Sequence, residues 1–146
     1  MHWTLSKIDE SLRQSCFYEQ KNISASLVNS GLIMTFHDYG DLPVVLAVGE
    51  QQILVEVALV ERNEFSHPEQ IDYQLLNTHK YLPLSTVAID KIDGQDWYVL
   101  FGSLSKQSKI EVIGEELIAL VSNTLSVIDA LEPLYKFNAA QNEGAS

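Results

Sequence analysis

Hydrophobic residues are spaced at helical intervals near the start of the chain. Ile8, Leu12 and Cys16 lie four residues apart, and Thr4 precedes them as a residue type that caps helix N-termini. We therefore expect a first helix that continues to about Tyr18. Cys16 lies on its apolar side, which predicts a small buried side chain rather than a reactive thiol.

Alternating apolar residues replace this helical spacing over residues 32–60. Alternation places successive side chains on opposite faces of a sheet, so residues 32–37, 44–48 and 52–60 are expected to form strands. Glycine-containing turn sequences separate these runs, which predicts an antiparallel meander. Residues 23–28 alternate only loosely, and the sequence leaves open whether they form a strand.

The apolar spacing becomes helical again over residues 67–79, where we expect a second helix. Ser66 can cap this helix, and Glu69 completes a capping box. Pro68 fits the first turn, because its missing N–H has no partner there in any case.

A hairpin is expected after this helix. Asp93 and Gly94 lie between two apolar runs, at 86–92 and 96–104, and this dipeptide is a strong signal for a tight hairpin turn. Both faces of the 96–104 run are apolar, which predicts a strand buried on both sides. Helices would cover one face, and a second subunit could cover part of the other.

The last predicted element is a long helix over residues 114–136, whose apolar residues form two adjoining stripes. Pro133 is expected to kink or end it, and the small polar residues 138–146 to form a flexible tail. The sequence thus predicts a single α+β domain over residues 1–137. It would contain an antiparallel sheet of about five strands and three helices, in the order helix, strand meander, helix, hairpin and long C-terminal helix.

Acidic residues outnumber basic residues along the whole chain. There are 20 Asp and Glu against 9 Lys and Arg, for a formal net charge of -11, and no part of the chain is a separate acidic tail. Such a surface repels nucleic-acid phosphates and anionic lipids, so we expect neither nucleic-acid binding nor direct membrane binding. The N-terminus lacks the pattern of a signal peptide, and a single cysteine excludes an internal disulfide. We expect a soluble cytoplasmic protein.

The sequence contains no recognisable reaction or metal motif. No two of its four histidines lie three or four residues apart, so no helix would carry a histidine metal pair. Ser103 lacks the glycines of a nucleophile elbow, and there is no glycine-rich phosphate loop. We therefore predict no catalytic residues, no cofactor and no metal.

Four blocks of sequence resemble the YjfI-like family of uncharacterised bacterial proteins. They cover about residues 41–136, and they are Asp41–Leu54, Pro83–Ser85, Tyr98–Ser105 and the helix residues Glu115, Glu116, Leu120 and Asn123. The resemblance implies a fold like that of type III secretion chaperones, which are small acidic α+β proteins that dimerise and bind an extended protein segment. It also implies a link to a phage-shock-protein-A-like membrane-stress system, because family genes tend to neighbour genes of that kind.

Our first functional hypothesis is a non-enzymatic protein-interaction module, a dimeric chaperone or adaptor whose protein partner is not identified. Its candidate interface residues lie on the last helix and the last strand; they are Leu117, Val121, Ile128, Phe101 and Val99. The helix stripe could equally pack inside one chain. The alternatives are a structural subunit, or an enzyme or small-molecule binder with a site near the loop 38–41 and the end of the 96–104 strand.

Overall fold

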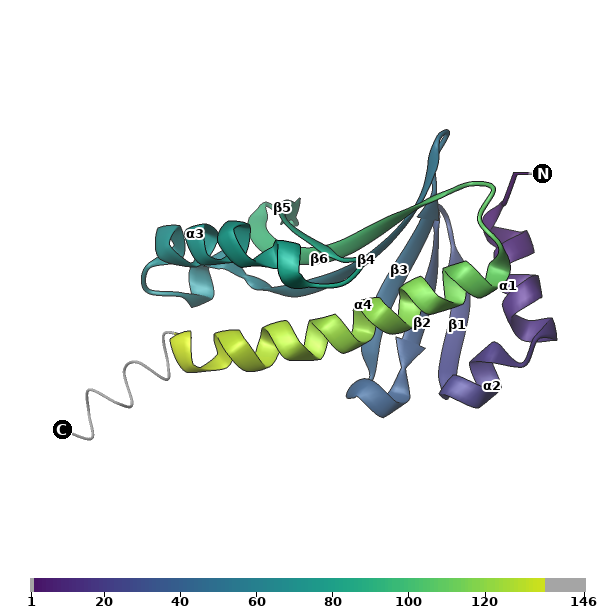
Figure 1. Ribbon diagram of the computed structural model, residues 1–146, viewed down its shortest axis with the longest axis horizontal. Coiled ribbons are helices and arrows are strands. Elements are labelled where there is room, and N and C mark those ends of the chain that lie inside the picture. Colours follow the sequence, from purple (N-terminus) through teal and green to yellow (C-terminus); the bar gives the residue numbers. More distant parts are fainter. Residues whose placement is uncertain (1, 136–146) are drawn as a thin grey trace.

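A six-stranded antiparallel sheet is the centre of the fold in the computed structural model, which describes residues 2–135 (Figure 1). The strand order across the sheet is β1-β2-β3-β4-β6-β5, which leaves β1 and β5 as the two edge strands. The predicted tail at 138–146 lies outside the described residues. The strands are β1 (Ile23–Val28), β2 (Gly31–Phe36), β3 (Leu42–Val48), β4 (Gln52–Glu61), β5 (Thr86–Ile92) and β6 (Gln95–Ser105). The α-helices are α1 (Leu5–Gln14), α2 (Phe17–Lys21), α3 (Pro68–Thr78) and α4 (Ile110–Leu131).

The helices gather on one face of the sheet, and the core lies between them and the strands. The long helix α4 runs across the sheet, with α1 and α2 at one end and α3 at the other (Figure 1). Alternation buries every second side chain of the central strands against the helices. The fully buried side chains of β2, β3 and β4 are Leu32, Met34, Phe36, Val44, Leu46, Ile53, Val55 and Val57.

The α+β class and the element order agree with the sequence prediction, and the strand count differs by one. Residues 23–28, which the sequence left open, form β1 and pair with β2 in register from Ile23↔Phe36 to Val28↔Gly31. Only Ile23 and Ala25 of β1 bury a side chain even partly, since β1 is an edge strand. This shallow burial explains why its apolar pattern is weak.

The first predicted helix is two helices, and Cys16 is exposed rather than buried. Cys16 adopts a left-handed backbone (φ 62°) between α1 and α2, which ends the first helix and turns the chain. Its side chain therefore leaves the apolar face that Ile8 and Leu12 continue to occupy. A four-residue spacing places a residue on a helix face only while the helix continues.

The second predicted helix and the hairpin are present. Helix α3 spans Pro68–Thr78, but its N-cap is His67 without a side-chain cap bond, so the expected capping role of Ser66 is wrong. Asp93 and Gly94 both have positive φ (50° and 81°), as a two-residue turn between β5 and β6 requires.

An ion pair and a tyrosine connect α3 to the rest of the fold. The guanidinium of Arg62 donates to both carboxylate oxygens of Asp72 on α3, from Nε to Oδ1 and Oδ2 and from Nη2 to Oδ2, and the Tyr98 hydroxyl on β6 also donates to Oδ1. The bonds from Arg62, more than the bond from Tyr98, hold the pKa of Asp72 below its usual value. Burial, reinforced by the bond to Asp72, raises the pKa of Tyr98.

Helix α4 begins four residues before the predicted start and ends at Leu131, where Glu132–Leu134 forms a 3₁₀ turn around Pro133. By length and composition alone, the segment Ile110–Leu134 would be long and apolar enough to span a membrane. That test is weak, because the core helix of a soluble protein also passes it. The side of α4 that faces the sheet is fully buried at Leu117, Leu120 and Val121, as in a core helix.

Candidate functional site

A pocket with both apolar and acidic side chains in its wall lies between the N-terminal half of α4, the end of β6 and the loop before β5. We call it the Glu116 pocket, and its volume is about 540 Å³. It is lined by Leu84, Ser85, Thr86, Gly102, Ser103, Leu104, Val112, Glu115 and Glu116. Three of the four blocks that carry the family resemblance meet here, although they are far apart in the sequence.

Gly102 makes room for the carboxylate of Glu116. A Cβ atom at Gly102 would lie 1.8 Å from Oε1 of Glu116 and 3.1 Å from the carbonyl oxygen of Leu84. Glycine is therefore the residue that allows α4, β6 and the 83–85 loop to come this close. The Glu116 carboxylate lies directly over the strand backbone.

Glu116 is the most unusual residue of this pocket. Only 4% of it is exposed, and within residues 2–135 its carboxylate forms no hydrogen bond or ion pair. Burial raises the pKa of Glu116, because a charged carboxylate loses its hydration there. A buried carboxylate without a partner is costly, which makes Glu116 a candidate functional residue.

The loop that borders the pocket is strained and held in place by α4. Leu84 has a positive φ of 67°, which is rare for a residue with a branched, bulky side chain. Asn123 of α4 donates hydrogen bonds from Nδ2 to the carbonyl of Pro83 and to Oγ of Ser85, both 2.8 Å long. Strained backbone that the surrounding structure holds fixed occurs often at functional sites.

The pocket also lies beside an open stretch of strand edge. Strand β5 begins at Thr86, which pairs with Phe101 of β6. Beyond that point, the segment from Gly102 to Ser105 pairs with β4 on one side only, and no described strand lies on its other side. Backbone groups of β6 are thus available next to the Glu116 carboxylate.

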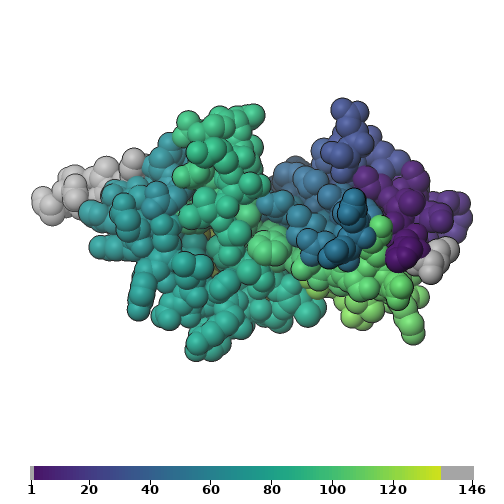
Figure 2. Space-filling model, turned by 90° about the horizontal axis from the view of Figure 1, so that it is seen from above, coloured from purple at the N-terminus to yellow at the C-terminus, as the bar shows by residue number. Residues whose placement is uncertain are grey.

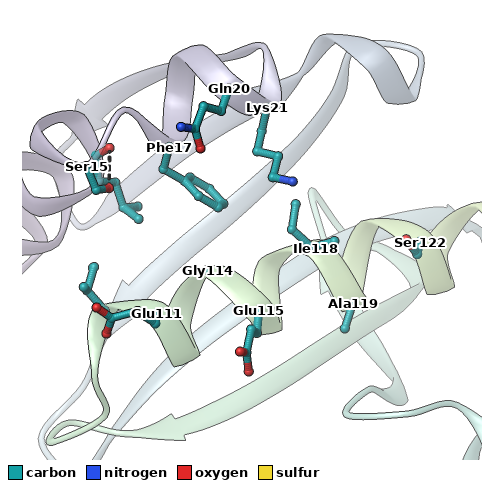
Figure 3. A pocket seen from close by; sticks show the side chains of 12 residues that line it. Ser15, Phe17, Gln20, Lys21, Glu111, Gly114, Glu115, Ile118, Ala119 and Ser122 are labelled. Carbon is teal, nitrogen blue, oxygen red and sulfur yellow. Dashed lines mark hydrogen bonds between the residues drawn. The ribbon is translucent and has the colours of Figure 1, made fainter.

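A second hollow lies between α2 and α4, on the other side of α4 (Figure 3). It has a volume of about 530 Å³, and Phe17 of α2 lies over Gly114 of α4. Figure 3 shows Lys21 directed toward α4, whereas Glu115 points from α4 to the opposite side. Glu115 lines both this hollow and the Glu116 pocket.

Exposed apolar side chains surround the outer edge strand β5. Leu76 of α3 is 68% exposed and Ile89 of β5 is 49% exposed, and both line one shallow hollow of about 210 Å³. Tyr73, on the same helix, is 71% exposed. We call Tyr73, Leu76 and Ile89 the α3–β5 surface.

The five candidate interface residues are divided between the core and the opposite face of the sheet. Leu117 and Val121 are fully buried in the core of the single chain, so a second subunit could not reach them in this conformation. Ile128 is half-buried farther along α4. Phe101 is half-buried and Val99 is 2% exposed. Both alternate along β6 with the core residues Tyr98 and Leu100, so their side chains lie on the opposite face of the sheet from α4.

The loop predicted as an alternative site contains part of a hydrogen-bonded chain. His37 Nε2 lies 2.6 Å from Oγ of Ser24, and His37 Nδ1 lies 2.7 Å from Oδ1 of Asp41. With the proton on Nδ1, the histidine accepts from the serine and donates to the aspartate, as in a serine nucleophile with its base. Asp41 is 75% exposed, and none of the three residues lines the hollows described above. The other end of the predicted alternative site, Ser103, lies in the Glu116 pocket instead.

Comparison with known proteins places this chain in a family. Residues 2–135 match a family described as uncharacterized proteins conserved in bacteria, DUF2170. The chain belongs to the DUF2170 family. The uncharacterized family protein YjfI of Escherichia coli K12 is 31% identical over 113 residues, which cover 77% of this chain and 85% of YjfI. YjfI of E. coli O157:H7 matches to the same extent. The resemblance inferred from the sequence blocks is thus confirmed.

Two solved structures share the fold of this DUF2170 chain. YbjN from E. coli superimposes with a TM-score of 0.66 and 12% identity, over 88% of this chain and 91% of YbjN. A chain of the ExsC–ExsE complex superimposes with a TM-score of 0.58 and 14% identity, over 90% of this chain and 96% of that one. The expected fold, that of type III secretion chaperones, is confirmed by the match to the ExsC–ExsE complex.

Proposed function

We propose that this DUF2170 protein is a non-enzymatic protein-binding module that dimerises through the α3–β5 surface. The observation that carries the proposal is the position of Leu76 and Ile89, two largely exposed apolar side chains beside the unpaired edge of β5. Strand edges and exposed apolar residues both favour association with another chain. A second copy that added its own β5 would continue the sheet and cover these side chains.

The fold supports a protein-binding role, since ExsC has been solved in complex with a second protein, ExsE. We further propose that the module acts as a cytoplasmic chaperone or adaptor. A link to a phage-shock-protein-A-like membrane-stress system stays a prediction from the family resemblance. The net charge of -11 supports contact with a protein rather than with nucleic acid or anionic lipid.

Exchange of Ile89 for lysine tests the dimer. In a two-fold interface this residue occurs twice, so Ile89→Lys places two buried charges in the contact and is expected to raise the dimer dissociation constant at least about tenfold. Sedimentation velocity over a range of protein concentrations measures this constant. Val28→Lys is a matched control, because Val28 is also 49% exposed and lies on the other edge strand.

The proposed dimer surface and the control position are well separated. In Figure 2, α3 and the β5–β6 hairpin, in teal and green, lie at the opposite end of the molecule from the N-terminal helix, in purple. A wild-type chain that stays monomeric at high micromolar concentration would contradict the dimer. If Val28→Lys weakened the dimer as much as Ile89→Lys, the change in the dissociation constant would come from the added charge and not from the α3–β5 surface.

A second candidate function is supported by the chain of hydrogen bonds through His37. In this alternative, Ser24 would attack an ester, His37 would accept its proton, and Asp41 would orient the histidine. Hydrolysis of p-nitrophenyl acetate should then fall to the level of buffer in Ser24→Ala and stay unchanged in Ser26→Ala, a serine on the same face of β1. An equal rate in the wild type and Ser24→Ala would eliminate this alternative, which the high exposure of Asp41 already disfavours.

A further inference from the structure

We infer that the Glu116 pocket binds a cationic group, either a guanidinium or a primary ammonium, through an ion pair with the Glu116 carboxylate. The inference goes beyond the proposed dimer, because the pocket lies between α4, β6 and the 83–85 loop of one chain. It holds whether this chain is a monomer or a dimer.

The first step of the argument is the carboxylate itself. Glu116 is 96% buried, lines the pocket, and has no hydrogen-bond or ion-pair partner within residues 2–135. Its carboxylate oxygens are not completely buried, so they remain accessible from the pocket. A charge in this position gains most from a partner that brings the opposite charge.

The second step is the chemistry of the pocket wall. No lining residue is basic, and a second acidic residue, Glu115, lines the same pocket. The carbonyl of Leu84 lies next to Gly102, and the buried hydroxyl of Ser85, which accepts a hydrogen bond from Asn123, also belongs to the pocket wall. A pocket rich in acceptors fits a ligand group that carries several donors, and a guanidinium has five.

Other ligand classes fit this pocket less well. An anion would meet two carboxylates and no basic group. Among the described residues, no group of three or more His, Cys, Asp or Glu side chains is placed so that it could hold a metal ion. An ammonium or guanidinium group needs only one carboxylate and neighbouring carbonyl or hydroxyl acceptors.

The group could come from a side chain of a protein partner or from a free amine. The open edge of β6 from Gly102 to Ser105 lies next to the carboxylate, so an extended segment could pair with it and place an arginine or lysine in the pocket. A free polyamine would use the pocket without the strand edge. The two sources share the same recognition chemistry, and the probes below separate them.

The test is a titration of ¹⁵N-labelled full-length protein, followed by the backbone amide signals of Gly102, Ser103 and Glu116. The probes are N-acetyl-arginine methylamide, its uncharged isostere N-acetyl-citrulline methylamide, putrescine, and a blocked peptide with one arginine between valines. We expect the arginine probe to shift these signals and the citrulline probe to bind at least about tenfold more weakly.

The substitution Glu116→Gln is expected to weaken binding of the arginine probe at least about tenfold, because it removes the charge of the side chain and keeps its shape. Glu111→Gln is the control, since Glu111 is an exposed acidic residue of α4 that does not line the pocket. Circular dichroism verifies that both variants fold. Tighter binding of the peptide than of the blocked arginine would assign a protein segment as the source, and tighter binding of putrescine than of the peptide would assign a free amine.

Equal binding of arginine and citrulline probes, or an unchanged affinity in Glu116→Gln, would overturn the inference. So would the absence of any shift at Gly102 with all of the charged probes. The same titration on Ile89→Lys separates the two proposals, because loss of the dimer should leave binding at Glu116 unchanged.

Discussion

Exchange of Leu117 for alanine is expected to lower the free energy of unfolding by about 2–5 kcal/mol. Leu117 is fully buried between α4 and the sheet, so the variant loses the transfer free energy of its methyl groups and leaves a cavity. Chemical denaturation monitored by circular dichroism measures the change. The result decides whether the apolar stripe of α4 belongs to the core of one chain.

Leu125→Ala is the matched control, because it makes the same change on the same helix at a residue that is 38% exposed. Its effect on the free energy of unfolding should be about 1 kcal/mol or less, because a partly exposed side chain removes less apolar surface from water on folding. If Leu117 belonged to a subunit interface instead, Leu117→Ala would weaken association at low concentration and change the stability of the monomer little. If Leu117→Ala lowered the free energy of unfolding by less than Leu125→Ala does, the burial of Leu117 would be contradicted.

Helices and strands with regularly spaced hydrophobic residues could be predicted from the sequence, because burial of one face directly produces that spacing. The alternation of β4 and the helical spacing of α3 both correspond to side chains that point into the core. The Asp93-Gly94 turn follows from local backbone preferences, which do not depend on the rest of the fold. Cys16 shows the limit, since one left-handed residue ended a helix whose spacing appeared to continue.

The role of the stripe on α4 could not be predicted from its period. A helix that packs on its own sheet and a helix that packs on a second subunit carry the same apolar arc. The structure separates them by placement: Leu117 and Val121 face the sheet, whereas the exposed apolar residues lie elsewhere, on α3 and β5. The sequence left both interpretations open, and two of its five candidate interface residues, Leu117 and Val121, are buried in the core of one chain.

The Glu116 pocket depends on contacts between distant residues. Its signal in the sequence was present only as separate blocks, and Glu116 is 14 residues from Gly102. Strand register and helix placement bring them within contact distance. The chain Ser24, His37 and Asp41 arises similarly, because the β1–β2 pairing brings Ser24 next to a loop that was already a candidate.

Exchange of Glu116 for glutamine is expected to raise the free energy of unfolding by about 1–3 kcal/mol at pH 7.5 in the absence of ligand. The substitution keeps the shape of the side chain and removes a charge that is buried without a partner. The measurement is chemical denaturation of the wild type and the variant side by side. Glu115→Gln, at an exposed neighbour, should change the stability by about 0.5 kcal/mol or less.

The size of this gain should depend on pH in a defined direction. Burial raises the pKa of Glu116 in the folded chain above its ordinary value of 4.5, so the folded state holds this proton more tightly than the unfolded state. The wild type therefore loses stability as the pH rises from 4.5 through the folded pKa, and Glu116→Gln does not undergo this loss. The pKa of Glu56 is also raised, by burial and secondarily by Asp90. Because Glu56 is present in both proteins, its contribution cancels in the difference between their free energies of unfolding.

The difference between the two proteins should thus be smallest near pH 4.5, should grow as the pH rises, and should level off once Glu116 is ionised in both the folded and the unfolded state. A difference that is independent of pH, or a variant less stable than the wild type at pH 7.5, would show that Glu116 already has a compensating partner. If the pocket binds a cation, a saturating amount of N-acetyl-arginine methylamide should stabilise the wild type more than it stabilises Glu116→Gln. A carboxylate that destabilises the free protein and stabilises the complex is then retained for binding rather than for folding.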